Sequence, residues 1–169
     1  MSKIKAVIFD WGDTIMRDYR MYNWRMDFWP RVELMPGAHS ALKDLPPGVI
    51  CCLATNAAHS DAYLVARAFN RVAVRQYFDH IFTSLDLGVE KPNPEFFRKI
   101  LRRLRLRADQ CVMIGDSYRK DIVPAKTLGM RTIWFCRKEP CGDAPKADLV
   151  IHSMSEAAEA VRRLMDAES

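Results

Sequence analysis

The chain has 169 residues, of which 49% are hydrophobic and 28% charged, and its net charge is +5 at pH 7. This composition excludes a disordered chain and predicts one soluble domain over residues 1–169. Such a domain buries about 70% of the surface that its unfolded chain exposes. No apolar run approaches the roughly 20 residues that span a bilayer. The positive charge does not indicate a nucleic-acid partner, because the densest basic run, residues 98–107, alternates with Ile and Leu like a solvated helix face.

Short apolar runs alternate with segments of helical periodicity along most of the chain. The predicted strands are residues 6–9, 49–53, 81–83, 111–114, 131–135 and 149–151. The predicted helices are residues 38–45, 61–69, 94–104, 120–128 and 155–165. Strands that alternate with helices predict an α/β fold, a doubly wound parallel sheet with helices on both faces in three α/β/α layers.

Residues 16–35 interrupt this alternation. Aromatic side chains such as Trp24 and Trp29 lie there among the arginines Arg17, Arg20, Arg25 and Arg31. The stretch is too short for a domain and too aromatic for a plain linker. It is interpreted either as a loop packed on the domain or as a very short cap over the mouth of the sheet, and the two readings are compatible.

Polar side chains follow three of the predicted strands directly. Asp10, Thr55 and Asp116 each come at a carboxyl end, which is where ligands bind in an open parallel sheet. Lys91 and Asp121 lie in the polar segments GVEKPNP and GDSYRKD. We therefore expect a site at this edge of the sheet.

These residue types meet the needs of phosphoryl transfer. A carboxylate such as Asp10 can attack phosphorus and divide one displacement into two easier steps, provided that a cation such as Lys91 offsets the negative charge. The Thr55 hydroxyl and nearby backbone amides suit phosphoryl oxygens. Asp116 and Asp121, with Asp10, form a set of oxygen donors suited to Mg²⁺.

Four motifs in this order resemble the haloacid dehalogenase (HAD) superfamily along nearly the whole chain. The first, an apolar strand ending D-x-D-G-T, is similar to VIFDWGDTI at Asp10, and the second is similar to CCLATN at Thr55. The third matches Lys91 in GVEKPNPEFF, and the fourth, G-D-x4-D, matches GDSYRKD at Asp116 and Asp121. The resemblance implies a Rossmann-like fold and a magnesium-dependent phosphatase.

The resemblance also implies roles for single residues. Asp10 is the expected nucleophile, which forms an aspartyl-phosphate, and Thr55, Asn56 and Lys91 are expected to bind the phosphoryl group. The expected magnesium ligands are Asp10, Asp116, supporting Asp121 and the backbone carbonyl of Gly12. The expected partner is a small phosphorylated metabolite, and the sequence leaves a homo-oligomer open.

Position 12 departs from the family pattern. Family phosphatases carry a carboxylate there, which acts as general acid and then as base, and Gly12 can do neither. General acid–base catalysis contributes typically 10²–10⁴-fold, so its loss would slow turnover without abolishing binding or attack. Asp13 is the nearest candidate for the missing acid and base, if Gly12 adopts a positive φ that turns the Asp13 side chain toward the site. Asp18, Asp27 and Glu33 could also reach the site, and the sequence does not rank them.

Three other functions are compatible with part of this motif pattern. Phosphonate-cleaving members use a lid lysine, which residues 14–35 lack, and dehalogenases work without the acidic pair Asp116 and Asp121. Both are disfavoured. The alternative that stays open is a catalytically weak module that binds magnesium and phosphate in an interaction or regulatory role.

The five cysteines are expected to be buried, reduced thiols. Three of them, Cys51, Cys52 and Cys111, lie inside apolar runs, and Cys136 and Cys141 are spaced too widely for a redox pair. No histidine cluster suggests zinc. With no signal-peptide pattern at the N-terminus, the expected location is the cytoplasm.

Overall fold

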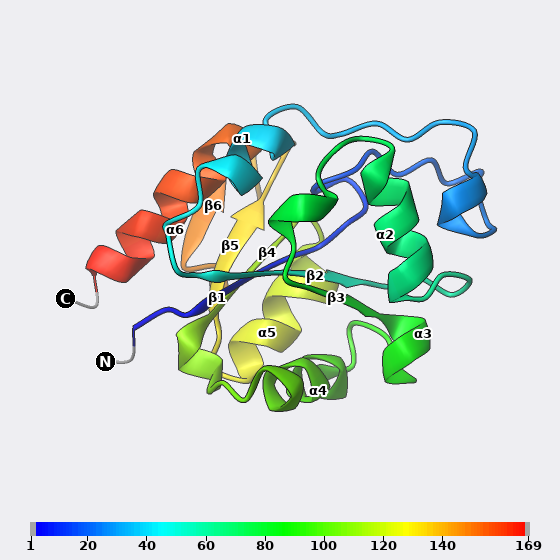
Figure 1. The fold of residues 1–169 in the computed structure, drawn as a ribbon. Helices are drawn as coiled ribbons and strands as arrows, with labels where there is room; N and C mark the ends of the chain where they lie inside the picture. Colours follow the sequence, from blue (N-terminus) through cyan, green and yellow to red (C-terminus); the bar gives the residue numbers. More distant parts are fainter. Residues whose placement is uncertain (1–2, 168–169) are drawn as a thin grey trace.

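A computed structural model describes residues 3–167, which form a six-stranded parallel sheet with helices on both faces (Figure 1). The strands run in the order β3-β2-β1-β4-β5-β6. Their bounds are β1 Ala6–Phe9, β2 Ile50–Thr55, β3 His80–Thr83, β4 Cys111–Gly115, β5 Arg131–Phe135 and β6 Leu149–Ile151. The predicted doubly wound α/β fold is confirmed.

The predicted helices are present with shifts at their ends, and the structure adds a short helix, α3, that the sequence pattern did not predict. Their bounds are α1 Ala38–Lys43, α2 Ala62–Asn70, α3 Ser84–Leu87, α4 Pro94–Leu104, α5 Val123–Thr127 and α6 Ala157–Asp166. The helix expected from residue 61 begins one residue later, because Asp61 is its cap and accepts the Leu64 N–H. The helix expected over 120–128 divides into a π-helical turn, Tyr118–Ile122, followed by α5.

The central strand β1 shows why both faces of the sheet must be covered. All four of its residues are buried, as expected of a strand between two helical layers. Val7 and Phe9 pack into the core beneath α1, α2 and α6, whereas Ala6 and Ile8 pack into the core beneath α4 and α5. Both faces of β1 are therefore apolar, and its first polar side chain is that of Asp10, directly after its carboxyl end.

Residues 16–35 leave the sheet after β1 and return beside it. Met16 and Leu34 form an antiparallel bridge, and the Arg17 N–H donates to the Glu33 carbonyl, so the two ends of the stretch lie together. A 3-10 turn, η1 Met26–Phe28, packs against α2, and the Met26 N–H donates to Ser60 Oγ at 3.0 Å (Figure 1). No helix within residues 3–167 is long and apolar enough to cross a membrane.

Candidate active site

The polar residues predicted from the strand ends meet at one edge of the sheet. β1 pairs with β2 on one side and β4 on the other, so Asp10, Thr55 and Asp116 follow three adjacent strands. The chain order reverses between β1 and β4, the point at which doubly wound sheets bind ligands. A cavity of about 510 Å³ opens there, and all three residues line it together with Lys91 and Asp121.

The loop after Asp10 reverses the chain within a few residues. The Trp11 carbonyl accepts the N–H groups of Thr14, Ile15 and Met16. Gly12 was expected to take the positive φ that re-aims its neighbour, but Asp13 takes it instead, with φ +58°. An aspartate tolerates this conformation because its short polar side chain can hydrogen-bond locally, and Asp13 Oδ1 accepts the Asp18 N–H at 3.1 Å.

Thr14 connects the nucleophile loop to the end of β4. Its buried hydroxyl lies 3.3 Å from Asp10 Oδ2 and 3.4 Å from Asp116 Oδ1, and it accepts the Asp116 N–H at 3.1 Å. One hydroxyl therefore sets the spacing between two carboxylates that are 106 positions apart in the chain.

Lys91 is the buried cation of the site. Its Nζ lies 2.7 Å from Asp10 Oδ1, 2.7 Å from Asp121 Oδ1 and 3.0 Å from the Ala54 carbonyl, and only 3% of the residue is exposed. Burial alone would lower the pKa of this ammonium, but the charges of Asp10 and Asp121 outweigh burial and raise it. Lys91 is therefore charged at neutral pH and places its positive charge against the carboxylate of Asp10.

Asn56 holds Lys91 from the neighbouring strand end. Its side-chain amide donates to the Lys91 carbonyl at 2.8 Å and accepts the Lys91 N–H at 2.9 Å. The Asn56 side chain, which was expected to bind phosphate, therefore positions Lys91. Its contact with phosphate stays a prediction. The Thr55 hydroxyl, in contrast, has no hydrogen-bond partner among residues 3–167 although only 3% of the residue is exposed, so it is available to a ligand in the cavity.

Asp121 reaches the site from the π-helical turn and packs on Gly115. A Cβ built on Gly115 would lie 2.3 Å from Asp121 Oδ2, so glycine is required there. The Ser117 N–H donates to the same oxygen at 3.1 Å, and Lys91 binds the other. Both oxygens of Asp121 are therefore engaged by the protein.

Asp10, Asp116 and Asp121 can each offer one carboxylate oxygen within 4.8 Å of the others. Burial, and next the charge of Asp10, raise the pKa of Asp116 and Asp121 to about 7. Within residues 3–167 these three carboxylates make ion pairs with Lys91 alone, so a divalent cation would balance their remaining charge. An all-oxygen donor set with this excess of negative charge fits magnesium.

Two further carboxylates belong to the nucleophile loop. Asp13 Oδ2 lies 3.1 Å from the guanidinium of Arg137, in the loop after β5. Asp18 lies over Gly12 at the mouth of the cavity, where a Cβ built on Gly12 would lie 3.4 Å from Asp18 Cβ. Partial burial and the neighbouring Asp13 raise the pKa of Asp18. Spacing alone could not single out this residue, because its place depends on the path of the loop.

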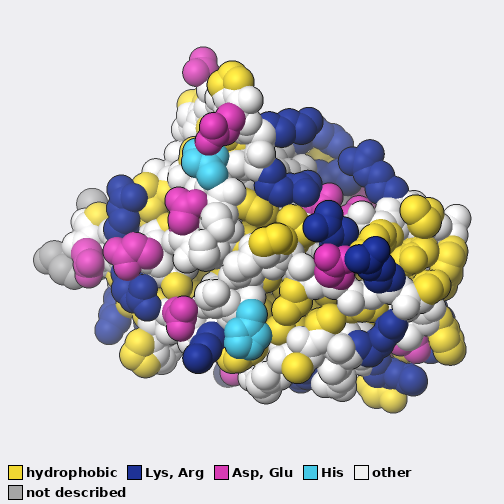
Figure 2. All heavy atoms as spheres, turned by 90° about the horizontal axis from the view of Figure 1, so that it is seen from above, with side chains coloured by type: hydrophobic (Ala, Val, Ile, Leu, Met, Phe, Trp, Pro, Cys, Tyr) yellow, Lys and Arg dark blue, Asp and Glu magenta, His cyan; other side chains and the backbone are white. Residues whose placement is uncertain are grey.

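Residues 20–29 form the outer wall of the cavity. Tyr22 packs against Trp24 and Trp29, with ring centroids 5.2 Å and 5.6 Å apart. In the space-filling view, apolar side chains gather with Lys and Arg at the right-hand end, where residues 16–35 and α2 lie (Figure 2). Large exposed apolar side chains in these two segments are Met21, Trp24, Phe28 and Tyr63.

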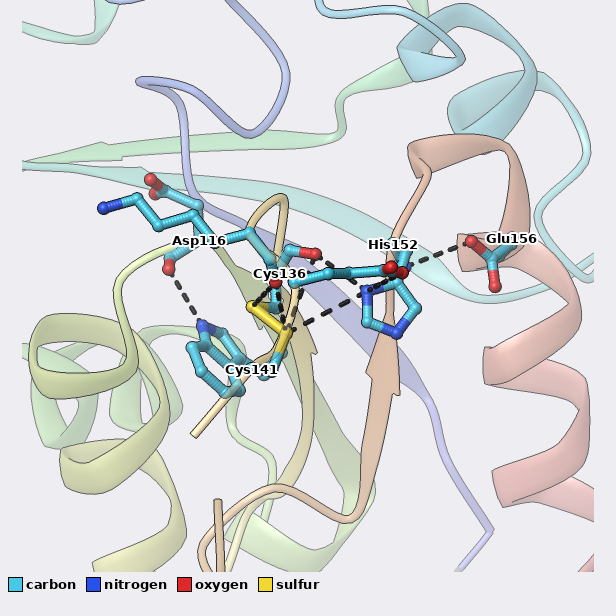
Figure 3. Close-up of a disulfide and its surroundings, with 8 residues drawn as sticks. Asp116, Cys136, Cys141, His152 and Glu156 are labelled. Carbon is cyan, nitrogen blue, oxygen red and sulfur yellow. Dashed lines mark hydrogen bonds and ion pairs between the residues drawn. A yellow bond between two sulfur atoms is a disulfide. The ribbon is translucent and has the colours of Figure 1, made fainter. Parts of the chain in front are cut away.

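The expectation of five reduced cysteines is wrong for two of them. Cys136 and Cys141 form a disulfide, because the loop after β5 doubles back and brings their Cα atoms to 6.3 Å (Figure 3). His152, just beyond β6, lies beside this disulfide, and its Nδ1 is 2.9 Å from the Cys136 carbonyl (Figure 3). Cys51, Cys52 and Cys111 are buried free thiols, as expected.

Comparison with known proteins adds a family match to this geometry. A family model described as haloacid dehalogenase-like hydrolase matches residues 25–129, which is more than half of the chain. The matched range includes Thr55, Lys91, Asp116 and Asp121 and begins after Asp10.

Two relatives and one solved structure illustrate the likeness. A glyceraldehyde 3-phosphate phosphatase of Methanocaldococcus jannaschii is 36% identical over 96 residues, 56% of this chain and 42% of that protein. A ribulose-1,5-bisphosphate 5-phosphatase of Halopiger xanaduensis is 31% identical over 118 residues, 69% of this chain and 48% of that protein. The chain thus spans less than half the length of these relatives. An uncharacterized protein from Listeria monocytogenes serotype 4b has the same fold, with a TM-score of 0.83, 25% identity and coverage of 96% and 99% of the two chains.

Proposed function

Because the chain belongs to the haloacid dehalogenase-like hydrolase family, we propose that it is a phosphatase that hydrolyses phosphomonoesters through an aspartyl-phosphate on Asp10. The observation that carries the proposal is the buried Asp10–Lys91–Asp121 network at the carboxyl edge of the central strand. The two relatives named as phosphatases support the reaction class.

The first chemical step needs an ionised nucleophile and a neutralised phosphoryl group. Lys91 holds Asp10 through its contact at 2.7 Å, and the same ammonium offsets negative charge that the substrate brings. Thr55 donates its free hydroxyl to a phosphoryl oxygen, while Asn56 holds Lys91 in place through the Lys91 backbone. The bond from an Asp10 oxygen to phosphorus forms as the bond to the leaving oxygen breaks, and water then releases phosphate.

We assign magnesium to the acidic cluster. Asp10 and Asp116 would bind it directly, with the backbone carbonyl of Gly12, and Asp121, which Lys91 and the Ser117 N–H hold in place, would support the ion or its water. When bound, the ion supplies positive charge that stabilises the developing charge on the transferring phosphoryl group.

Residues 16–35 form a short cap in this proposal. Their aromatic side chains wall the cavity, which is sized for a small molecule, so the proposed partner is a small phosphorylated metabolite. The chain is then one hydrolase domain over residues 1–169 with this insertion.

Phosphate release from a panel of phosphomonoesters, measured with magnesium and with EDTA, tests the proposed function. We expect turnover of at least one substrate with magnesium and a fall of more than about 100-fold in EDTA, because charge stabilisation by a metal ion contributes several kcal/mol. Restoration by excess magnesium is the control. Binding of orthovanadate without turnover of any substrate would instead favour the weak binding module.

Arg20 indicates the substrate class within this proposal. Arg17 and Arg31 contact Glu33 at 3.7 Å and 2.9 Å, and Arg25 contacts Asp27 at 2.9 Å. Arg20 lines the cavity, and within residues 3–167 no carboxylate lies in ion-pair distance of it. A second anionic group on the substrate would supply that partner.

Replacement of Arg20 with Ala is expected to raise KM about tenfold or more for a bisphosphate, because a charged hydrogen bond contributes about 1.5–3 kcal/mol. KM for p-nitrophenyl phosphate, which has no second anionic group, should change less than about twofold. Arg17→Ala is the matched control. Equal effects of Arg20→Ala on both substrates would contradict the assignment.

A further inference from the structure

The space beside Gly12 is filled by another carboxylate. A Cβ built on Gly12 would lie 3.4 Å from Asp18 Cβ, 3.6 Å from its Cγ and 3.7 Å from its Oδ2. The side chain of Asp18 therefore lies where a side chain on residue 12 would point, and it lines the same cavity as Asp10 and Lys91.

The backbone of Asp18 is held in this place by its neighbours. Its N–H donates to Asp13 Oδ1 at 3.1 Å, and Asp13 Oδ2 is in turn anchored by the guanidinium of Arg137 at 3.1 Å. No hydrogen bond or ion pair within residues 3–167 engages the Asp18 carboxylate. This arrangement leaves a positioned carboxylate free to exchange a proton with a ligand.

The other acidic residues near the nucleophile loop are already engaged. Asp13 uses both oxygens, one for Arg137 and one for the Asp18 N–H. Asp27 pairs with Arg25 at 2.9 Å, and Glu33 accepts the Tyr19 hydroxyl at 2.7 Å. Neither Asp27 nor Glu33 is among the described residues that line the cavity.

We propose that Asp18 supplies the general acid and base that position 12 lacks, an inference that rests on the proposed phosphatase function. As Asp10 forms its bond to phosphorus, the Asp18 carboxyl gives its proton to the leaving oxygen, which departs as an alcohol. The Asp18 carboxylate then takes a proton from the water that attacks phosphorus. Phosphate leaves, the carboxylate of Asp10 is restored, and Asp18 regains its proton.

The leaving group of the substrate distinguishes this role from a structural one. An alkoxide needs a proton to depart, whereas p-nitrophenolate departs without one. Asp18→Asn is therefore expected to lower kcat/KM for glycerol 3-phosphate by about 100-fold or more and kcat/KM for p-nitrophenyl phosphate by less than about threefold. Loss of the base should also slow the second step, so the variant should show a burst of p-nitrophenol.

Moving the carboxylate provides a second test. The double variant Asp18→Gly, Gly12→Asp should recover most of the glycerol 3-phosphate activity that Asp18→Gly alone loses, since the added side chain enters the vacated space. Asp143→Asn, at an exposed position in the loop that follows β5, is the control. An equal loss on both substrates, or no loss on glycerol 3-phosphate, would overturn the role of Asp18 in an active wild type. A wild type inactive on both would overturn the phosphatase function itself.

Discussion

Asp10→Asn is expected to lower phosphomonoester turnover by more than about 10⁴-fold, because an amide cannot form the aspartyl-phosphate. Asn keeps the size of the side chain, and Lys91 retains its contact with Asp121 at 2.7 Å, so the fold should persist. Acid-quench trapping with ³²P-labelled substrate should label the wild-type chain and leave Asp10→Asn unlabelled. Steady-state phosphate release measures the rate.

Asp143→Asn is again the matched control, because it makes the same chemical change at an exposed position. Circular dichroism and thermal unfolding of all three proteins separate loss of chemistry from loss of structure. Turnover of Asp10→Asn within tenfold of the wild type would show that another group attacks phosphorus.

Much of this site was predictable because parallel strands end at one edge. Asp10, Thr55 and Asp116 follow adjacent strands β1, β2 and β4, so the strand pattern placed them together before any side-chain geometry was known. Lys91 and Asp121 come from a loop and a turn; their polar segments made them candidates, and the motif resemblance implied their roles. In the structure Lys91 Nζ lies 2.7 Å from an oxygen of Asp10 and 2.7 Å from an oxygen of Asp121.

The place of Asp18 and the Cys136–Cys141 disulfide could not be predicted from the sequence, because both depend on how loops fold back. The positive φ at Asp13 and its contact with Arg137, far away in the sequence, set the path that brings Asp18 over Gly12. The Cys136–Cys141 disulfide follows from a similar reversal after β5. Periodicity describes strands and helices and carries no information about such reversals.

Lys91→Met is expected to destabilise the protein and to abolish turnover. Methionine retains an unbranched chain of similar length, but it leaves Asp10, Asp116 and Asp121 without a cation among them. Removal of one partner from a buried ion pair typically costs about 3–5 kcal/mol. The free energy of unfolding at pH 8 in EDTA, measured with urea, should fall by about that amount.

The difference in the free energy of unfolding between Lys91→Met and the wild type should shrink as the pH falls toward 5. Burial and the charge of Asp10 raise the folded-state pKa of Asp116 and Asp121 to about 7, whereas unfolded aspartates titrate near 3.9. Between these values the folded protein binds more protons than the unfolded chain, so lower pH favours folding. The charge of Lys91 lowers the pKa of Asp121, so its removal should raise that pKa further, and the variant should gain more stability from protonation than the wild type does. Lys99→Met is the matched control, because within residues 3–167 Lys99 Nζ donates only to the Leu87 carbonyl, at 2.7 Å. This variant should lose about 1 kcal/mol at either pH. If Lys91→Met were as stable as Lys99→Met at pH 8, the ammonium of Lys91 would not be neutralising the acidic cluster.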